Sequence, residues 1–358
     1  MQKENVPNIS VDKILIIRTG MHGDVLLSTS CLEALRQKFP NAAIDFFVST
    51  PYHEILADNP FVNSVLVSSK KKYLNYLFGR IRLLVRIFFS RYQLVIDFQA
   101  TDISRLVVLL SRAKYRLGWE DAKFASLFYN LKAPSNRDCY SAVRNFRMLR
   151  PLGIQEQPFK MLYYIKEQSA KKVDDWLLSN NIDSQELIIF SPGAGRAYKA
   201  WNPYSFAALA DVIIEKYNIK AAIIWAPKEL DAALKMKNAM KKNVFLLDKT
   251  TYNEAAAFVK KAKLLICNDG GLNHVSVAVG TPSIAFFCFT NPQFWSPQGA
   301  FKNHYHIYNA EYAKDKLNMN DKNNTFGITP EEAFNKVEKI FEELGFMIKS
   351  RNSFEHNE

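Results

Sequence analysis

The fold is decided by residues 264–274, which have the sequence LLICNDGGLNH. A short apolar run ends in Asn-Asp-Gly-Gly, and a helical pattern begins at once and continues to Gly280. This pattern predicts a buried strand followed directly by a helix, as in parallel α/β sheets. The two glycines allow close approach of the backbone, and a helix N-terminus offers unpaired N–H groups and a positive dipole. We therefore predict a diphosphate site at the carboxyl end of this strand, where open α/β sheets bind ligands.

The same residues are also compatible with a plain strand-to-helix turn, in which Asp269 caps the helix. His274 stands one helical turn beyond Gly270, where it could face the same ligand, but a single histidine is more often structural. The spacing alone leaves both interpretations open.

Patterns of the same kind fill the chain in two series. Expected strands of the first series are 14–18, 44–48, 64–67, 94–98 and 115–118, with a helix at 25–39. Expected strands of the second series are 187–191, 221–225, 244–247, 263–267 and 283–287. Two such series in 358 residues predict an α/β protein with two doubly wound, Rossmann-like domains.

The domain boundary is expected where Pro151-Leu152-Gly153 interrupts the pattern. We accordingly predict an N-terminal domain over residues 1–160 and a C-terminal domain over 161–330. A helix within 331–348 is expected to pack back across the seam, and residues 349–358 form a polar tail.

A second glycine-containing loop follows the expected strand 187–191 and has the sequence PGAGRAYKAWNP over residues 192–203. Arg196 and Lys199 supply cations there, and a lysine suits a phosphate without the help of a metal. The alternative is a solvated surface loop. Neither GxxxxGK[ST] nor GxGxxG is present, so the loop is not a Walker or dinucleotide fingerprint.

A third loop, residues 18–25 with the sequence RTGMHGDV, also joins a strand to a helix. Asp24 stands where this helix starts. It is either an N-cap or a general base that removes the proton of an acceptor hydroxyl. His22 is a weaker candidate for the same role.

The net charge of +12 is concentrated in residues 70–91, which contain seven lysines and arginines and no acidic residue. Apolar residues lie between the cations, as in a basic amphipathic helix that contacts anionic lipid headgroups. An ordinary crossover helix with a solvated basic face is the alternative. No nucleic-acid recognition motif is present, so we do not expect a nucleic-acid partner.

Cysteine usage and hydropathy also restrict the class of protein. The four cysteines form no CxxC pair and no compact cluster with histidine, which argues against a disulfide scaffold or a structural zinc site. No stretch approaches the roughly 20 apolar residues that span a bilayer, and the first apolar run is too short for a signal peptide. We expect a cytoplasmic protein without a metal or cofactor.

The three loops, in this order and spacing, resemble the heptosyltransferase family of lipopolysaccharide biosynthesis, over residues 14 to about 344. The matching motifs are Gly23-Asp24-Val25, then Asp269-Gly270-Gly271 with His274, and Gly280-Thr281-Pro282. Residues 289–292 and 295–297 resemble the family's next loop. The resemblance implies the GT-B fold, with the active site between two Rossmann-like domains. It also implies transfer of a heptose from ADP-heptose to the lipopolysaccharide core, with inversion and without a metal.

The resemblance also assigns roles by position. It implies that Asp24 is the base, that Lys199 contacts the donor phosphates and that Asp269 lies near the donor sugar. It also implies that Gly270, Gly271 and Leu272 lie at the phosphates, Glu229 at the ribose and Thr250 beside the adenine. On the acceptor side it implies Asp97 and Gln99, and we place His22 there as well. Two departures concern the sugar and the acceptor: Gly270 replaces a commoner threonine, and a glycine usual soon after Gln99 is missing.

The resemblance further accounts for the charge, because an anionic acceptor embedded in the inner membrane would favour a basic face. The enzyme would then be peripheral on the cytoplasmic leaflet. Two other functions remain open: a nucleotide-sugar epimerase or hydrolase on a similar scaffold, and a basic, non-catalytic binding protein. The Gly-Asp loop favours transfer, because a separate acceptor needs its own base.

Overall fold

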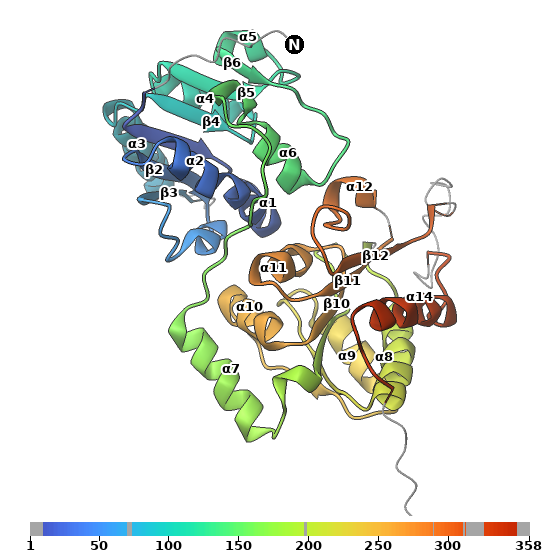
Figure 1. The fold of residues 1–358 in the computed structure, drawn as a ribbon. Coiled ribbons are helices and arrows are strands. Elements are labelled where there is room, and N and C mark those ends of the chain that lie inside the picture. The colour runs from blue at the N-terminus through green and yellow to red at the C-terminus, as the bar shows by residue number, and fades with distance from the viewer. Residues whose placement is uncertain are drawn as a thin grey trace, which may run out of the picture. The chain divides into compact units, whose positions relative to one another are not determined.

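The structure is a computed structural model that describes residues 10–348, apart from 70–73, 197–198, 289, 311 and 313–325. The chain forms two compact units, Met1–Tyr164 and Ile165–Glu358. Each unit contains a six-stranded sheet in which all paired strands are parallel, with helices on both faces (Figure 1). The predicted polar tail, 349–358, lies outside the described residues.

The N-terminal unit has the sheet order β3-β2-β1-β4-β5-β6. Its strands are β1 (Lys13–Ile17), β2 (Ala43–Ser49), β3 (Ser64–Ser68), β4 (Leu94–Asp97), β5 (Tyr115–Trp119) and β6 (Leu131–Ala133). Its helices are α1 (His22–Ser28), α2 (Leu32–Lys38), α3 (Leu74–Phe89), α4 (Asp102–Leu110), α5 (Ala125–Phe128) and α6 (Ser141–Arg147).

The C-terminal unit has the sheet order β12-β11-β10-β7-β8-β9. Its strands are β7 (Leu187–Ser191), β8 (Lys220–Ile223), β9 (Phe245–Leu246), β10 (Leu264–Asn268), β11 (Ser283–Phe287) and β12 (His304–Tyr308). Its helices are α7 (Glu167–Ser179), α8 (Pro203–Tyr217), α9 (Leu230–Ala239), α10 (Tyr252–Lys261), α11 (Gly271–Val279), α12 (Pro292–Trp295) and α14 (Pro330–Glu343).

Both sheets have the Rossmann strand order, which confirms the predicted α/β class with two doubly wound units. The central strands β7, β10 and β11 are buried along their whole length, because helices cover both faces of the sheet. The strand order reverses between β1 and β4 in the first sheet, and between β7 and β10 in the second. Ligands of such sheets bind beyond the carboxyl ends of the strands at this switch point.

The predicted strands are all present, and two further edge strands were not predicted. Strand β6 has only three residues, and β12 reads HYHIY, which is not an apolar run. The predicted helix 25–39 is divided into α1 and α2 by a 3₁₀ turn at Thr29–Cys31. The hydroxyls of Ser28, Thr29 and Ser30 each donate to the carbonyl three residues earlier, and such bonds bend helices.

Helix α14, the helix expected to pack across the seam, packs on α8 within the C-terminal unit. The rings of Tyr217 and Phe341 lie 4.8 Å apart, and Lys216 forms an ion pair with Glu338. The inner side of α14 contributes Val337 and Phe341 to the same core as α8. The apolar face of this helix is therefore used to cover its own sheet.

Candidate functional site

In the C-terminal unit, the buried side chain of Asn268 ties together the two loops at the switch point. Its amide group donates to the carbonyl oxygens of Pro192 and Gly193 at 2.8 and 3.2 Å. Its Oδ1 accepts from the backbone N–H of Trp201 at 2.9 Å. Trp201 is fully buried and stacks on Phe286, with ring centroids 4.1 Å apart. Both ends of the loop 192–201 are thus fixed beside the start of α11.

We expect Asn268→Asp to destabilise the C-terminal unit by about 3 kcal/mol, because a buried carboxylate would face two carbonyl oxygens that now accept hydrogen bonds. The measurement is the free energy of unfolding in urea. Asn243→Asp, at an exposed position, is the matched control and should stay within about 0.5 kcal/mol of the unsubstituted chain. Equal stability of the two variants would show that Asn268 does not hold the loop.

Helix α11 begins without a side-chain cap. Its N-cap is Gly270, and no side chain accepts a hydrogen bond there, so the N–H groups of the first turn, including that of Leu272, point outward. The carboxylate of Asp269 instead accepts from the Thr290 hydroxyl. The interpretation of Asp269 as a helix cap is therefore wrong. Uncapped N–H groups at a helix N-terminus are groups that can bind an anion.

Two close contacts define the space around these loops. A Cβ on Gly193 would come within 2.5 Å of the Cβ of Glu229, so only glycine allows Glu229 to lie against the loop. Burial raises the pKa of Glu229, which stands at the N-cap of α9. A Cβ on Gly271 would lie 2.9 Å from the Tyr252 hydroxyl, whereas one on Gly270 would meet only the Asn268 carbonyl, at 3.8 Å.

The other residues predicted for this site differ in position. Lys199 follows a turn in which its N–H donates to the Arg196 carbonyl at 2.9 Å, and Arg196 is exposed. Thr250 lies in the loop before α10, partly exposed. His274 is only 4% exposed, with its ring 6.4 Å from that of Trp295, so it belongs to the interior of the unit.

In the N-terminal unit, Asp24 forms an ion pair with Arg18. The distance from Arg18 Nη2 to Asp24 Oδ1 is 2.7 Å, and 21% of the Asp24 side chain is exposed. Met21 is the N-cap of α1 and makes no side-chain cap, so Asp24 lies in the first turn and is not the N-cap. A Cβ on Gly20 would lie 2.6 Å from Asp24 Oδ2. The carboxylate is therefore held by Arg18 on one oxygen and faces Gly20 with the other.

The loop after β4 meets this site across the switch point. Arg18 Nη1 donates to the Phe98 carbonyl at 2.7 Å, and the Thr19 N–H donates to Gln99 Oε1 at 3.1 Å. Asp97, predicted on the acceptor side, is fully buried. It accepts from the N–H groups of Gln99 and Ala100 and from the Tyr129 hydroxyl, and burial raises its pKa. Asp97 is therefore a positioning residue for Gln99 and has no surface for an acceptor.

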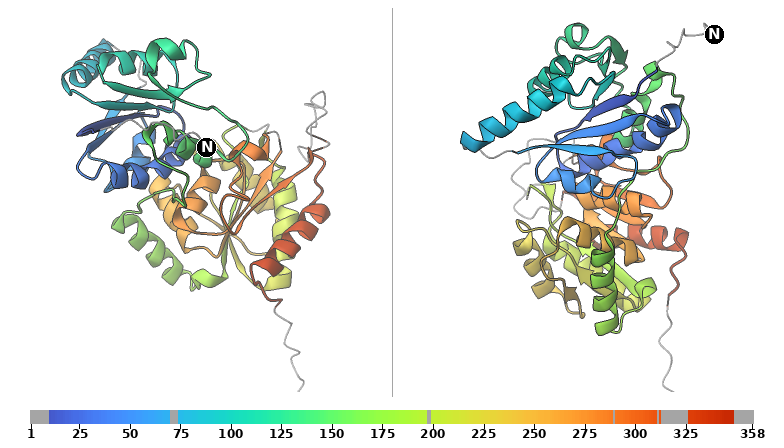
Figure 2. Two further views of the ribbon diagram at one scale, coloured as in Figure 1. Left: turned by 45° about the horizontal axis from the view of Figure 1, so that its top comes forward. Right: turned by 90° about the vertical axis from the view of Figure 1, so that its left-hand side faces the viewer.

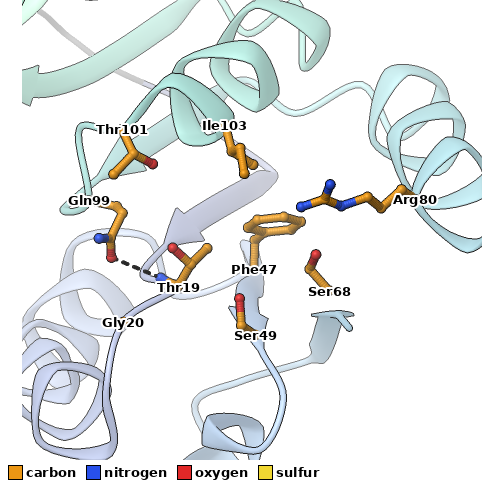
Figure 3. A pocket seen from close by; sticks show the side chains of 9 residues that line it. All are labelled: Thr19, Gly20, Phe47, Ser49, Ser68, Arg80, Gln99, Thr101 and Ile103. Carbon is orange, nitrogen blue, oxygen red and sulfur yellow. Dashed lines mark hydrogen bonds between the residues drawn. The ribbon is translucent and has the colours of Figure 1, made fainter. Parts of the chain in front are cut away.

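A pocket of about 390 Å³ opens beside Gly20 at this edge of the sheet (Figure 3). Its described lining combines neutral polar groups with the cation Arg80 of α3, whose guanidinium points toward the Phe47 ring. Among the described residues, the pocket is lined by Thr19, Gly20, Phe47, Ser49, Ser68, Arg80, Gln99, Thr101 and Ile103. Such a lining suits a hydroxyl-rich ligand that carries negative charge.

His22 lies on the other side of the α1 start. Its ring packs edge-on against Tyr52, with centroids 4.9 Å apart. Burial and the nearby His53 lower its pKa to about 4. His22 is therefore neutral at physiological pH and contributes no charge to the pocket. Within the described ranges, no group of three or more His, Cys, Asp or Glu side chains is placed to hold a metal ion.

Four residues that shape the loops of these sites were not predicted from the sequence, namely Arg18, Gly20, Asn268 and Thr290, and neither was the lining of the pocket apart from Gln99. The first three lie inside the loop motifs, within a few residues of His22 or directly before Asp269. Their position at a strand end was the available signal in the sequence, but Arg18 and Asn268 also bond to loops that follow other strands. For Thr290, the signal in the sequence was its place in the loop after β11.

Comparison with known proteins gives a family and a set of similar structures. The family glycosyltransferase family 9 (heptosyltransferase) matches residues 80–326. Lipopolysaccharide heptosyltransferase 3 of Escherichia coli is 23% identical over 287 residues, which are 77% of this chain and 83% of that protein. A glycosyl transferase family 9 structure from Veillonella parvula has a TM-score of 0.81 at 21% identity, covering 95% of this chain and 99% of that one. E. coli heptosyltransferase WaaC with ADP-2-deoxy-2-fluoro heptose has a TM-score of 0.71 at 21% identity, covering 91% and 99%.

Proposed function

The chain belongs to glycosyltransferase family 9, the heptosyltransferases, and we propose that it transfers a heptose from ADP-heptose to the lipopolysaccharide core. It is a glycosyltransferase with the predicted GT-B class of fold. The observation that carries the proposal is the Asn268-tied pair of loops at the switch point of the second sheet. These loops place an uncapped helix start beside a lysine-containing loop, as a nucleoside diphosphate requires.

On the donor side, we propose that the N–H groups of Gly271 and Leu272 bind the diphosphate. Lys199 then stabilises the negative charge that develops on the departing ADP, with Arg196 as a second cation. Glu229 accepts from the ribose hydroxyls, and the backbone at Thr250 lies beside the adenine. With these cations, departure of ADP needs no metal ion.

On the acceptor side, we propose that the pocket beside Gly20 binds the acceptor sugar and that Asp24 is the general base. The acceptor oxygen attacks the anomeric carbon from the face opposite the diphosphate, and the bond to the diphosphate breaks, so the configuration inverts. The electron pair of that bond leaves with ADP, and the hydroxyl proton passes to Asp24. The ion pair with Arg18 orients the carboxylate for this transfer.

The test of this function is the product formed from ADP-heptose and a purified heptose-deficient core acceptor, identified by mass spectrometry. We expect one added heptose for each ADP released, and no product from a UDP-sugar. Conversion of the donor to an isomer in the absence of an acceptor would identify an epimerase instead. Release of ADP and free sugar alone would identify a hydrolase.

The two adjacent glycines of the donor site should respond differently to an added methyl group. We expect Gly271→Ala to lower kcat/KM about tenfold, because the methyl group would collide with the Tyr252 hydroxyl and displace the first turn of α11. Gly270→Ala is the matched control, since its backbone is extended and its Cβ would make only an ordinary contact of 3.8 Å with the Asn268 carbonyl oxygen. Tyr252→Phe should restore most of the activity of Gly271→Ala. A similar loss in both alanine variants would contradict this geometry.

A further inference from the structure

Helices α3, α4 and α5 cover one face of the N-terminal sheet (Figure 2). Their inner sides pack together on the sheet through Leu84, Ile87, Val107, Val108 and Ala125. The basic segment predicted from the sequence, residues 70–91, thus contains helix α3, which packs on the sheet as an ordinary crossover helix does. This packing agrees with the alternative interpretation of that segment. The outer side of the same three helices is not used by this core.

The outer side of α3 carries a second apolar stripe. Phe78, Ile81, Val85 and Phe89 are exposed and follow one another at intervals of three, four and four residues, which places them on one face of the helix. Phe89 is 73% exposed. Beside this stripe lies a groove of about 280 Å³, and the described residues that line it are all apolar: Ile81, Leu84, Val85, Phe88, Phe89 and Leu110.

The apolar surface continues over the neighbouring helices. Helix α4 exposes Ile103, Leu106 and Leu109. At α5, Phe124 is 63% exposed and Leu127 is 67% exposed. Phe124 adopts a left-handed backbone conformation with φ of 59°, which is costly for a residue with a bulky side chain. The chain thus accepts backbone strain at a residue whose aromatic ring points to solvent.

Several cations lie beside this apolar surface, although the exposed Glu120 and Asp121 precede its α5 end. Arg82 and Arg86 of α3 are exposed beside the stripe, and the Arg112 guanidinium lies over the Phe88 ring, 5.0 Å from its centroid. Lys123 lies 5.0 Å from the centroid of Phe124 in the same manner. The acidic Asp102 of α4 is already paired with Arg105. A broad apolar surface with a basic rim matches a bilayer whose headgroups are anionic.

We propose that α3, α4 and α5 form a docking face that binds the surface of an anionic phospholipid bilayer. None of the helices in the described part of the chain is long and apolar enough to cross a membrane, so docking would be peripheral. Arg80 of α3 and Ile103 of α4 also line the pocket beside Gly20. Docking would therefore bring the mouth of that pocket to the membrane; this second point, unlike the docking itself, rests on the proposed function.

The test is cosedimentation of the full chain with vesicles of phosphatidylcholine, with and without 30% phosphatidylglycerol (about one anionic lipid in three), in the absence of donor and acceptor. We expect binding to the anionic vesicles that weakens as salt is added. Arg82→Gln and Lys123→Gln should each lower the partition coefficient about fivefold. Phe89→Ser on α3 and Leu127→Ser at α5 should each lower it about tenfold.

Matched controls come from the C-terminal unit. Leu178→Ser, at a leucine that is 82% exposed, and Lys237→Gln, at an exposed lysine, should leave vesicle binding unchanged. Equal binding to neutral vesicles, or full retention by either the α3 or the α5 variants, would overturn the three-helix docking face. A dimer in light scattering that Phe89→Ser dissociates, with vesicle binding unchanged, would assign the face to a second copy instead. Because no substrate is present, these outcomes are independent of whether the proposed transfer reaction is correct.

Discussion

Replacing Asp24 by asparagine is expected to lower kcat by about 10²–10⁴-fold while the dissociation constant for ADP stays unchanged. Asparagine keeps the size of the side chain and its hydrogen bond to Arg18, but its amide cannot take the proton of the acceptor hydroxyl. The loss should therefore appear in the chemical step. The measurements are the rate of ADP release with saturating substrates and calorimetric titration of ADP.

The matched control for this variant is Asp58→Asn. Asp58 is exposed in the same unit and has a left-handed backbone, with φ of 59°, that asparagine also adopts readily. It should keep the activity of the unsubstituted chain. If ADP affinity falls as steeply as the rate in Asp24→Asn, Asp24 is a structural partner of Arg18 and another group is the base.

Replacing Lys199 by alanine is expected to lower kcat/KM about 100-fold, because the same cation acts on the bound donor and on the departing diphosphate. Lys199 stands two residues before Trp201, whose backbone N–H is held by Asn268. Its position is therefore fixed by the core of the unit, and substitution at the surface of the loop should leave the fold intact.

The expected loss has two parts that separate measurements resolve. Weaker ADP binding in calorimetry reports on the ground state, and a lower kcat with saturating donor reports on the leaving group. Lys260→Ala, at an exposed lysine of α10, is the control and should change neither. Unaltered kinetics in Lys199→Ala would remove this lysine from the donor site.

Local sequence patterns were sufficient for much of the fold. Apolar runs predicted the central strands because these are buried on both faces, and the edge strand β12 was missed because its histidines and tyrosines break that pattern. The loops to which we assign donor and acceptor binding were also located, since each joins a strand directly to a helix. The cap interpretations of Asp24 and Asp269 remained open until the N-caps were identified as Met21 and Gly270.

The role of Asp97 shows where local patterns fail. It is the last residue of β4, and Asp269 directly follows β10, yet Asp97 is fully buried and accepts a hydrogen bond from the hydroxyl of Tyr129, 32 residues further on. Exposure and partners distinguish these two aspartates, and neither property is contained in the sequence around them.

The stretch 264–274 by itself determined that this chain builds a parallel α/β sheet in which a glycine-containing loop joins the end of a strand to a helix. Only the tertiary structure decided which loops act together. Arg18 reaches the Phe98 carbonyl 80 residues away, and Asn268 reaches Pro192 over 76 residues, because β1 lies beside β4 and β10 beside β7. The apolar surface shared by α3, α4 and α5 arises in the same way. Strand order brings distant segments together, and a periodicity that repeats every two to four residues carries no information about that order.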